Sequence, residues 1–240
     1  MKLNPTWQGI PFEVKEAIVQ NLDFKSRFRL RVCSKSDLYL IDNCPFFLEQ
    51  IEIHDSSLHI KDQYGYTRVK ENTFDHFLKI FKQSRTTIKS VILSLDGAQG
   101  AELCQVLAKT KIFRIRAKTV YFDFNGVSDQ DYLKIFDIFN AKTLSFRQTL
   151  SQNLLEELLK TETWKSAKQI FCYGRQDFPM DAVKNLEKFR CYVDSLSSED
   201  AQNIISSFAI RKNLMPGFGF RVNYSSGQVD LKVSSKLDKR

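Results

Sequence analysis

The sequence predicts an α/β protein in which an N-terminal helical module precedes a body built on a mostly parallel sheet. Up to about residue 45, apolar residues recur at helical spacing, and beyond residue 70 alternating runs take turns with helix-like stretches. The 240 residues are 42 % apolar, with 20 Phe but only 9 Gly and 5 Pro, which favours a packed core over linkers. The expected divisions are a module at 6–45, a junction at 46–70 and a repeat body at 71–240.

Residues 6–45 predict the helical module. Pro11 suits the first turn of a helix, where its missing N–H costs nothing, and Glu13 then favours the helix dipole. Four-residue spacing places three apolar side chains on one face of that helix: Val14, Ile18 and Leu22. Asp23 is expected to cap a second helix carrying Phe28, Leu30 and Val32.

This module resembles the F-box. The residues that carry the resemblance are Ile10-Pro11, Glu13, Ile18, Leu22, Leu30-Arg31-Val32-Cys33 and Lys35, with Ile10 where the family usually has Leu. The resemblance implies docking onto a Skp-type adaptor of a cullin–RING ubiquitin ligase, with the cullin scaffold beyond it. The expected docking residues are Ile10, Pro11, Glu13, Val14, Ile18, Leu22, Leu30, Val32 and Cys33. The alternative is an ordinary helical hairpin packed on the body.

Residues 46–70 predict a short antiparallel meander. Apolar residues alternate in three short runs separated by turn-forming residues: Ile51 and Ile53, Leu58 and Ile60, Tyr66 and Val69. His54 and His59 fall in this segment. Without a third ligand at metal spacing, we expect them to be surface or cross-strand residues.

From about residue 72 a weak internal repeat emerges. Strand-like runs cover 88–95, 117–124, 141–148, 167–174 and 187–194, and their leading lysines lie 29, 24, 26 and 20 residues apart. Helix-like stretches at 74–84, 101–113, 129–140 and 153–164 precede the first four runs. A further helix is expected at 197–210, capped by Ser197 or Ser198 with Asp200 in its first turn, and strands at 217–225 and 229–235 follow.

One strand and one helix every 20 to 29 residues is the period of leucine-rich-repeat architecture. The Leu and Asn signature of that family is missing, so we predict only a similar α/β solenoid, in which stacked units share a core. The alternative is a doubly wound α/β domain with helices on both faces of the sheet. Strands of such domains are near-continuously apolar, whereas these alternate, which favours one covered and one open face.

Part of the body resembles a second family, the FTH domain, which follows the F-box in nematode F-box proteins. The resemblance rests on residues 162–168, with Trp164-Lys165 as the main landmark, and on the helix–strand unit at 76–95. It extends over most of the chain after residue 70 and implies that the body contacts another protein.

Alternation assigns the two faces of the predicted sheet. The expected core side chains are Val91, Leu93, Leu95, Val120, Phe122, Phe124, Leu144, Phe146, Ile170, Cys172, Phe189 and Cys191. The opposite face carries Ile92, Ser94, Asp123 and Ser145, together with the residues expected to bind a target: Tyr121, Arg147, Phe171, Tyr173, Arg190 and Tyr192. Tyr, Phe and Arg are enriched at the dominant positions of protein interfaces. Alternatively, loops or terminal helices cover this face and its aromatics are core.

The net charge of +8 admits an acidic partner or nucleic acid. The leading lysines, Lys89, Lys118, Lys142, Lys168 and Lys188, could form a basic rim for an acidic partner, although a Lys at a strand start is more often simply solvated. The densest basic cluster is Lys109, Lys111, Arg114, Arg116 and Lys118. Nucleic-acid binding would also need stacking aromatics on a basic face, which we consider the less favoured interpretation.

No catalytic motif is recognisable. The segment at 97–102 lacks the Lys-Ser/Thr of a phosphate loop, and the three histidines accompany no Ser or Cys motif. The five cysteines, Cys33, Cys44, Cys104, Cys172 and Cys191, form no metal-binding pair and are expected to be buried thiols. We therefore predict no enzyme, metal or cofactor, and no membrane span or signal core, which favours the cytosol or nucleus.

Together, these features predict an adaptor that recruits a target protein to an SCF-type ubiquitin ligase. The alternative is a protein- or RNA-binding module that works outside any ligase.

Overall fold

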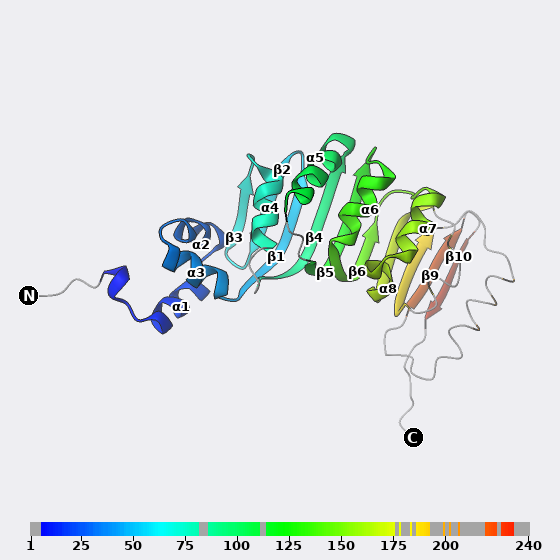
Figure 1. Cartoon of the computed structure of the whole chain (residues 1–240). Helices are drawn as coiled ribbons and strands as arrows, with labels where there is room; N and C mark the ends of the chain where they lie inside the picture. The colour runs from blue at the N-terminus through cyan, green and yellow to red at the C-terminus, as the bar shows by residue number, and fades with distance from the viewer. Residues whose placement is uncertain are drawn as a thin grey trace, which may run out of the picture. The chain divides into compact units, whose positions relative to one another are not determined.

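The computed structural model describes residues 6–81, 86–110, 114–175, 178, 183, 186–192, 199, 202, 206, 219–224 and 227–232. The chain divides into two compact units, Met1–Val91 and Ile92–Arg240, which are described separately below. The strand β4, Thr86–Asp96, crosses the boundary between them. The order of elements along the chain can be followed in Figure 1.

The first unit begins with a short 3-10 helix, Trp7–Gly9, and three α-helices, α1 (Phe12–Gln20), α2 (Phe24–Arg31) and α3 (Lys35–Asn43). The Asp23 side chain caps α2 by accepting a hydrogen bond from the Ser26 N–H, as predicted. Two expectations were wrong. Helix α1 ends at Gln20, so Leu22 lies beyond it, and Pro11 is the N-cap rather than the first helical residue.

The helix α3 was not predicted. Ser34 caps it, accepting a hydrogen bond from the Asp37 N–H, and Cys44 ends it. The core of the helices consists of Val19, Leu40, Ile41 and Cys44, with the half-buried Trp7, Leu22 and Leu30 packed against it. Two of the three helices therefore contribute the buried residues of a small core, and α2 contributes Leu30 from its last turn.

The predicted antiparallel meander is confirmed. It comprises β1 (Phe46–His54), β2 (Ser57–Asp62) and β3 (Gly65–Val69), and the helix α4 (Thr73–Phe81) follows. Asp55 and Ser56 both have positive φ, 48° and 55°, the conformation that a tight two-residue hairpin requires. Within this unit the strand order is β4-β1-β2-β3.

The second unit alternates helices and strands. Its first elements are α5 (Gly97–Ala108), β5 (Ile115–Asn125), α6 (Asp129–Asp137), β6 (Phe139–Phe146), α7 (Gln152–Lys160) and α8 (Glu162–Ser166). The strands β7 (Gln169–Arg175), β8 (Lys188–Tyr192), β9 (Gly219–Tyr224) and β10 (Gly227–Lys232) follow. Polar N-caps begin four of these helices: Asp96, Ser128, Ser151 and Thr161.

Neighbouring strands from β5 to β9 are parallel and lie in chain order, and β10 returns antiparallel to β9. The protein is thus a mixed α/β fold with N-terminal helices and a mostly parallel sheet. All five predicted Lys-led strands are present. The helix predicted at 197–210 lies largely outside the described residues.

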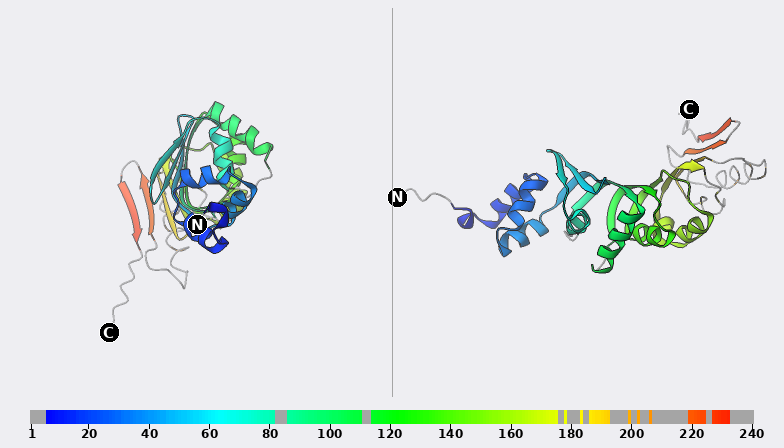
Figure 2. Two further views of the ribbon diagram at one scale, coloured as in Figure 1. Left: turned by 90° about the vertical axis from the view of Figure 1, so that its left-hand side faces the viewer. Right: turned by 90° about the horizontal axis from the view of Figure 1, so that it is seen from above.

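The described helices of the second unit, α5 to α8, cover one face of its strands (Figures 1 and 2). This arrangement excludes, for the described part of the chain, the doubly wound alternative. Parallel strands that follow one another in chain order have crossovers of one hand, which places the helices on a single face. All twelve residues assigned to the core by alternation are buried.

Aromatic rings fill the space between sheet and helices. Phe122 is fully buried and its ring centre lies 5.4 to 6.0 Å from those of five neighbours: Phe124, Tyr132, Phe136, Phe139 and Phe146. The two glycines of the 97–102 segment serve close packing instead of phosphate binding. A Cβ on Gly97 would lie 2.5 Å from the Gly126 carbonyl oxygen, and one on Gly100 would lie 2.9 Å from the Val127 side chain.

Candidate functional site

The N-terminal helices expose apolar side chains that a folded module would normally bury. Val14 and Ile18 lie one turn apart on α1 and are 49 % and 38 % exposed, while Val32 at the end of α2 is 74 % exposed. Large apolar groups left exposed on a small module are available to a protein partner.

The nine residues predicted for docking divide into two groups. Pro11, Glu13, Val14, Ile18, Val32 and Cys33 are exposed, and Ile10 is half-buried. Leu22 and Leu30, by contrast, pack against the buried core of the helices. The first group is available to a partner as the structure stands, whereas the second also holds the module together.

Three further exposed apolar residues of the helices were not among the predicted docking residues. Phe12, Leu38 and Tyr39 are 49 %, 36 % and 66 % exposed, and the last two lie on the helix α3. The pattern Ser34-x-x-Asp37 before an apolar run was the available sequence signal for that helix.

Asp37 anchors the start of α3 to the first residues of the module. Its Oδ1 accepts a hydrogen bond from Trp7 Nε1 at 2.7 Å, and its Oδ2 accepts one from the Ser34 hydroxyl at 2.7 Å. These hydrogen bonds hold the pKa of Asp37 below its usual value. A pocket of about 330 Å³ lies beside this contact and is lined by Lys15, Cys33 and Ser34, among others.

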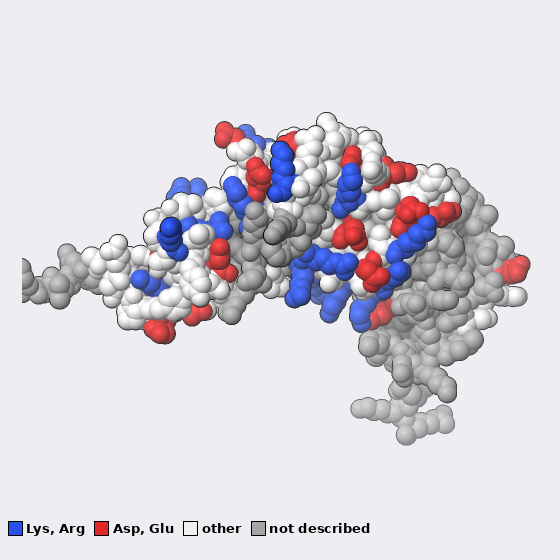
Figure 3. Space-filling view, in the orientation of Figure 1, with Lys and Arg blue, Asp and Glu red and all other residues white. Residues whose placement is uncertain are grey.

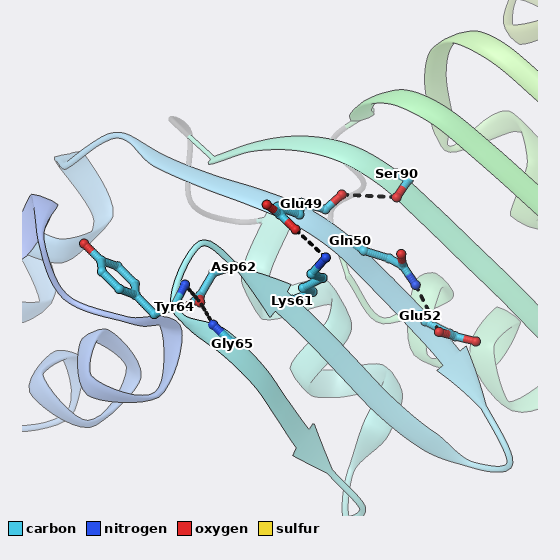
Figure 4. Close-up of polar contacts among 8 residues, drawn as sticks. All are labelled: Glu49, Gln50, Glu52, Lys61, Asp62, Tyr64, Gly65 and Ser90. Carbon is cyan, nitrogen blue, oxygen red and sulfur yellow. Dashed lines mark hydrogen bonds and ion pairs between the residues drawn. The ribbon is translucent and has the colours of Figure 1, made fainter.

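The helical module is fixed to the meander by two buried polar groups. Asp62, 5 % exposed, accepts a hydrogen bond from the Phe24 N–H at 2.7 Å, and it also accepts from the turn N–H groups of Tyr64 and Gly65 (Figure 4). Arg27, 4 % exposed, donates to the carbonyl oxygens of Leu22 and Pro45. The junction is therefore a packed connection and not a loose linker.

The Arg27 guanidinium also stacks over Phe46, 4.2 Å from the ring centre. Its desolvation lowers its pKa. On the same strand, Glu49 forms an ion pair with Lys61 at 2.7 Å across β1 and β2, and the Glu49 carbonyl oxygen accepts a hydrogen bond from Ser90 on β4 (Figure 4). These contacts continue the connection from the helices into the sheet of the first unit.

The sheet face opposite the helices brings three of the predicted target-binding residues, Tyr121, Phe171 and Arg190, into one row. Strand register places Tyr121, Ser145, Phe171 and Arg190 side by side on β5, β6, β7 and β8. The Arg190 guanidinium lies 5.9 Å from the ring centre of Phe171. Beyond this row the register of β7 and β8 shifts, so Tyr192 pairs with Arg175 and not with Tyr173. Tyr173 and Tyr192 are 48 % and 37 % exposed.

One expectation for this face was wrong. Ser145 was placed on the open surface but is 1 % exposed, and within the described structure its hydroxyl has no hydrogen-bond partner. Its small side chain lies in register between the larger residues Tyr121 and Phe171, both half-buried. Arg147 is exposed and forms an ion pair with Asp123 at 3.2 Å.

The histidines and cysteines do not converge on a centre. Among the described residues, no group of three or more His, Cys, Asp or Glu could hold a metal ion. His54 is exposed beside Asp55, His59 lies between Glu52 and Arg68 in the meander, and His76 contacts the edge of Phe28. Cys33 is exposed, contrary to the expectation of buried thiols, whereas the other four cysteines are buried.

Burial sets the properties of two of these thiols. It raises the pKa of Cys104 to about 12 and raises that of Cys172 well above its usual value. Such thiols carry little thiolate near neutrality and make poor nucleophiles. In the described part of the chain, no helix has the length and apolar character needed to cross a membrane.

Comparison with protein families gave two matches. The F-box domain matches residues 7–49, and the FTH domain matches residues 109–225. No curated protein and no solved structure matched the chain.

Proposed function

The chain carries an F-box domain followed by an FTH domain, the architecture typical of nematode F-box proteins, and from this premise we propose that it recruits a target protein to an SCF-type ubiquitin ligase. F-box proteins are generally non-catalytic, and the F-box implies binding to a Skp-type adaptor. The observation that carries the proposal is the exposed apolar surface of the matched F-box residues, above all Val14, Ile18 and Val32.

Docking would bury these side chains against the adaptor, which in turn joins the cullin scaffold. Full burial of an aliphatic side chain stabilises a complex by roughly 1.5–3 kcal/mol relative to full exposure. Because Val14 and Ile18 are already about half covered, we expect about 1 kcal/mol from each and more from Val32.

The protein would act by proximity and not by chemistry. Tethering a target to the ligase raises the effective concentration of the target's lysines near the loaded conjugating enzyme. Two buried contacts support this role, because they join the F-box helices to the meander without a flexible linker: the hydrogen bond from the Phe24 N–H to Asp62 and the stacking of Arg27 on Phe46. The ligase machinery would place the protein in the cytosol or the nucleus.

We further infer that the FTH body is a solenoid similar to leucine-rich repeats, in which each strand–helix unit stacks on the last. The parallel strands β5 to β9 in chain order and the helices on one face support this inference. The face opposite the helices would then present Tyr121, Arg147, Phe171, Tyr173, Arg190 and Tyr192 as the target-binding surface.

Co-purification with a Skp-type adaptor tests the docking step. The double variant Val14→Glu/Val32→Glu places charges on two exposed positions, so the module should still fold while adaptor affinity falls about 100-fold or more. Tyr64→Glu/Tyr66→Glu is the matched control, since these residues are 50 % and 70 % exposed and lie outside the matched F-box. If the unmodified chain does not bind the adaptor, the ligase role is rejected and a binding module that works outside any ligase is favoured.

An alanine series on the open face tests target recruitment. Tyr173→Ala and Tyr192→Ala change exposed rings, so they should preserve the thermal unfolding midpoint and reduce capture of the target by affinity purification. If these variants instead unfold while the remaining folded fraction still captures the target, the face is structural.

A further inference from the structure

The exposed cations of the second unit gather at one end of its parallel strands. Arg116 pairs with Asn140 and Ala117 with Ala141 in the parallel register of β5 and β6, so Lys118 and Lys142 are neighbours. The Lys168 N–H donates to the Lys142 carbonyl oxygen at 2.9 Å, which brings Lys168 next to Lys142. The three lysines form a row across adjacent strands about 4.8 Å apart, here called the basic row.

Further cations extend the basic row. Arg114 and Arg116 lie just before Lys118 along the chain, and both are exposed, as are the three lysines. In Figure 3, Lys and Arg side chains gather below the lower ends of β5 and β6. A positive surface is therefore built from three strands that the sequence separates by more than twenty residues each.

Few carboxylates balance these charges. Glu187 pairs with Lys168 at 2.6 Å, and the exposed Asp137 ends α6 at the same edge of the sheet. Within the described structure, Arg114, Arg116, Lys118 and Lys142 form no ion pair with any carboxylate. The nearby helical lysines differ, because Lys160 pairs with Glu157 and Lys165 pairs with Glu162.

This concentration of like charge is unfavourable by itself. Like charges that face each other on adjacent strands repel one another. We propose that the basic row, with Arg114 and Arg116, binds an acidic stretch of the recruited target protein. The proposal deepens the proposed function and rests on it only in calling the partner a recruited target.

An acidic polypeptide fits this surface better than nucleic acid does. Single-stranded nucleic acid binds where bases can stack on exposed aromatic rings. Among the described residues at this edge, 114–118, 139–142 and 164–168, the aromatic ones are Phe139 and Trp164, and both are buried. The exposed Lys and Arg groups can pair with the carboxylates of an extended acidic polypeptide, which needs no stacking surface.

Fluorescence anisotropy with a labelled oligoglutamate tests the proposal on the full-length protein. A peptide of about ten residues spans the basic row, since an extended chain rises about 3.3 Å per residue. We expect saturable binding that weakens with salt and that a Ser-Gly peptide of equal length does not show. Lys118→Glu/Lys142→Glu should weaken the binding by about tenfold or more.

The control variant Lys25→Glu/Lys70→Glu changes the net charge equally at exposed lysines of the first unit, and it should stay within about twofold of the unmodified protein. The neutral pair Lys118→Gln/Lys142→Gln, folded by circular dichroism, should show an intermediate loss. Equal weakening of oligoglutamate binding in the control would show that the binding depends on net charge alone, which would overturn the proposal. Tight binding of a single-stranded RNA that oligoglutamate does not displace would also overturn it.

These outcomes are separate from those of the docking test. Binding of oligoglutamate without capture of a Skp-type adaptor would retain the basic surface and reject the ligase role. Capture of the adaptor without oligoglutamate binding would retain the ligase role and reject the acidic-peptide site.

Discussion

Asp62 offers a sharp test of how the F-box helices are held to the rest of the first unit. Its Oδ2 accepts from the Phe24 N–H at 2.7 Å, while its Oδ1 accepts from Tyr64 and Gly65 at 2.8 and 3.0 Å. The Phe24 N–H belongs to the first turn of α2, where no carbonyl of the helix can reach it. Asp62→Asn can keep the turn contacts through Oδ1 but places an NH₂ group against the Phe24 N–H.

The magnitude follows from the number of donors that lose their acceptor. A hydrogen bond to a charged group contributes about 1.5–3 kcal/mol, so Asp62→Asn should cost about 2 kcal/mol of unfolding free energy. Asp62→Ala leaves three N–H groups without this acceptor and should cost about 4 kcal/mol. For a chain of this size, about 2 kcal/mol lowers the thermal midpoint by roughly 4–8 °C.

Urea and thermal unfolding followed by circular dichroism provide the assay, with amide hydrogen exchange at Phe24 as the local readout. Asp55→Asn is the matched control, because the Asp55 side chain is 77 % exposed and Asn tolerates its positive φ. We expect the control to remain within about 0.5 kcal/mol of the unmodified protein. An equally neutral Asp62→Asn variant, or unchanged exchange at Phe24, would show that Asp62 does not hold the helix in this way.

Three further predictions follow from the packing and electrostatics. Phe122→Ala should cost about 3–5 kcal/mol in urea unfolding because five rings surround the site, and a cost below about 1 kcal/mol would contradict that packing. A native thiol titration should detect one fast cysteine, Cys33, against five after unfolding; a second fast thiol would contradict the buried positions of the others. Hydrogen bonds from Trp7 and Ser34 depress the pKa of Asp37, so their stabilisation is present above the unfolded pKa of about 3.9 and lost as pH falls through the lower folded value. Asp37→Asn should therefore lose less stability than the unmodified protein between about pH 5 and pH 2, and parallel urea midpoints across that range would refute the assignment.

Much of the fold was predictable because its signals are local. Alternation of apolar residues located the five Lys-led strands and sorted their side chains into buried and opposite sets, since successive strand residues point to opposite faces. The helix α3 escaped prediction because Leu38, Tyr39, Leu40 and Ile41 form a continuous apolar run without helical spacing. The N-cap residue Ser34 was the one local sequence signal for this helix.

The candidate sites were less predictable because exposure depends on neighbours. Leu22 and Val32 are both apolar residues beside helix ends, yet one packs on the module's core and the other is 74 % exposed. Ser145 shares the alternation of its open-face neighbours, yet it is 1 % exposed, in register between two larger residues. Neither difference can be derived from spacing, since both arise from side chains distant in the sequence.

The two domain types and the period of the strand–helix units could be recognised from contiguous residues, because short motifs and alternation are local properties. The attachment of the F-box helices to the meander depends on the folded chain, since Asp62 lies 38 residues from Phe24. Folding also makes Lys118, Lys142 and Lys168 neighbours. Parallel pairing aligns equivalent positions of successive repeats, so a lysine that recurs once per repeat becomes a continuous charged surface only when the sheet forms.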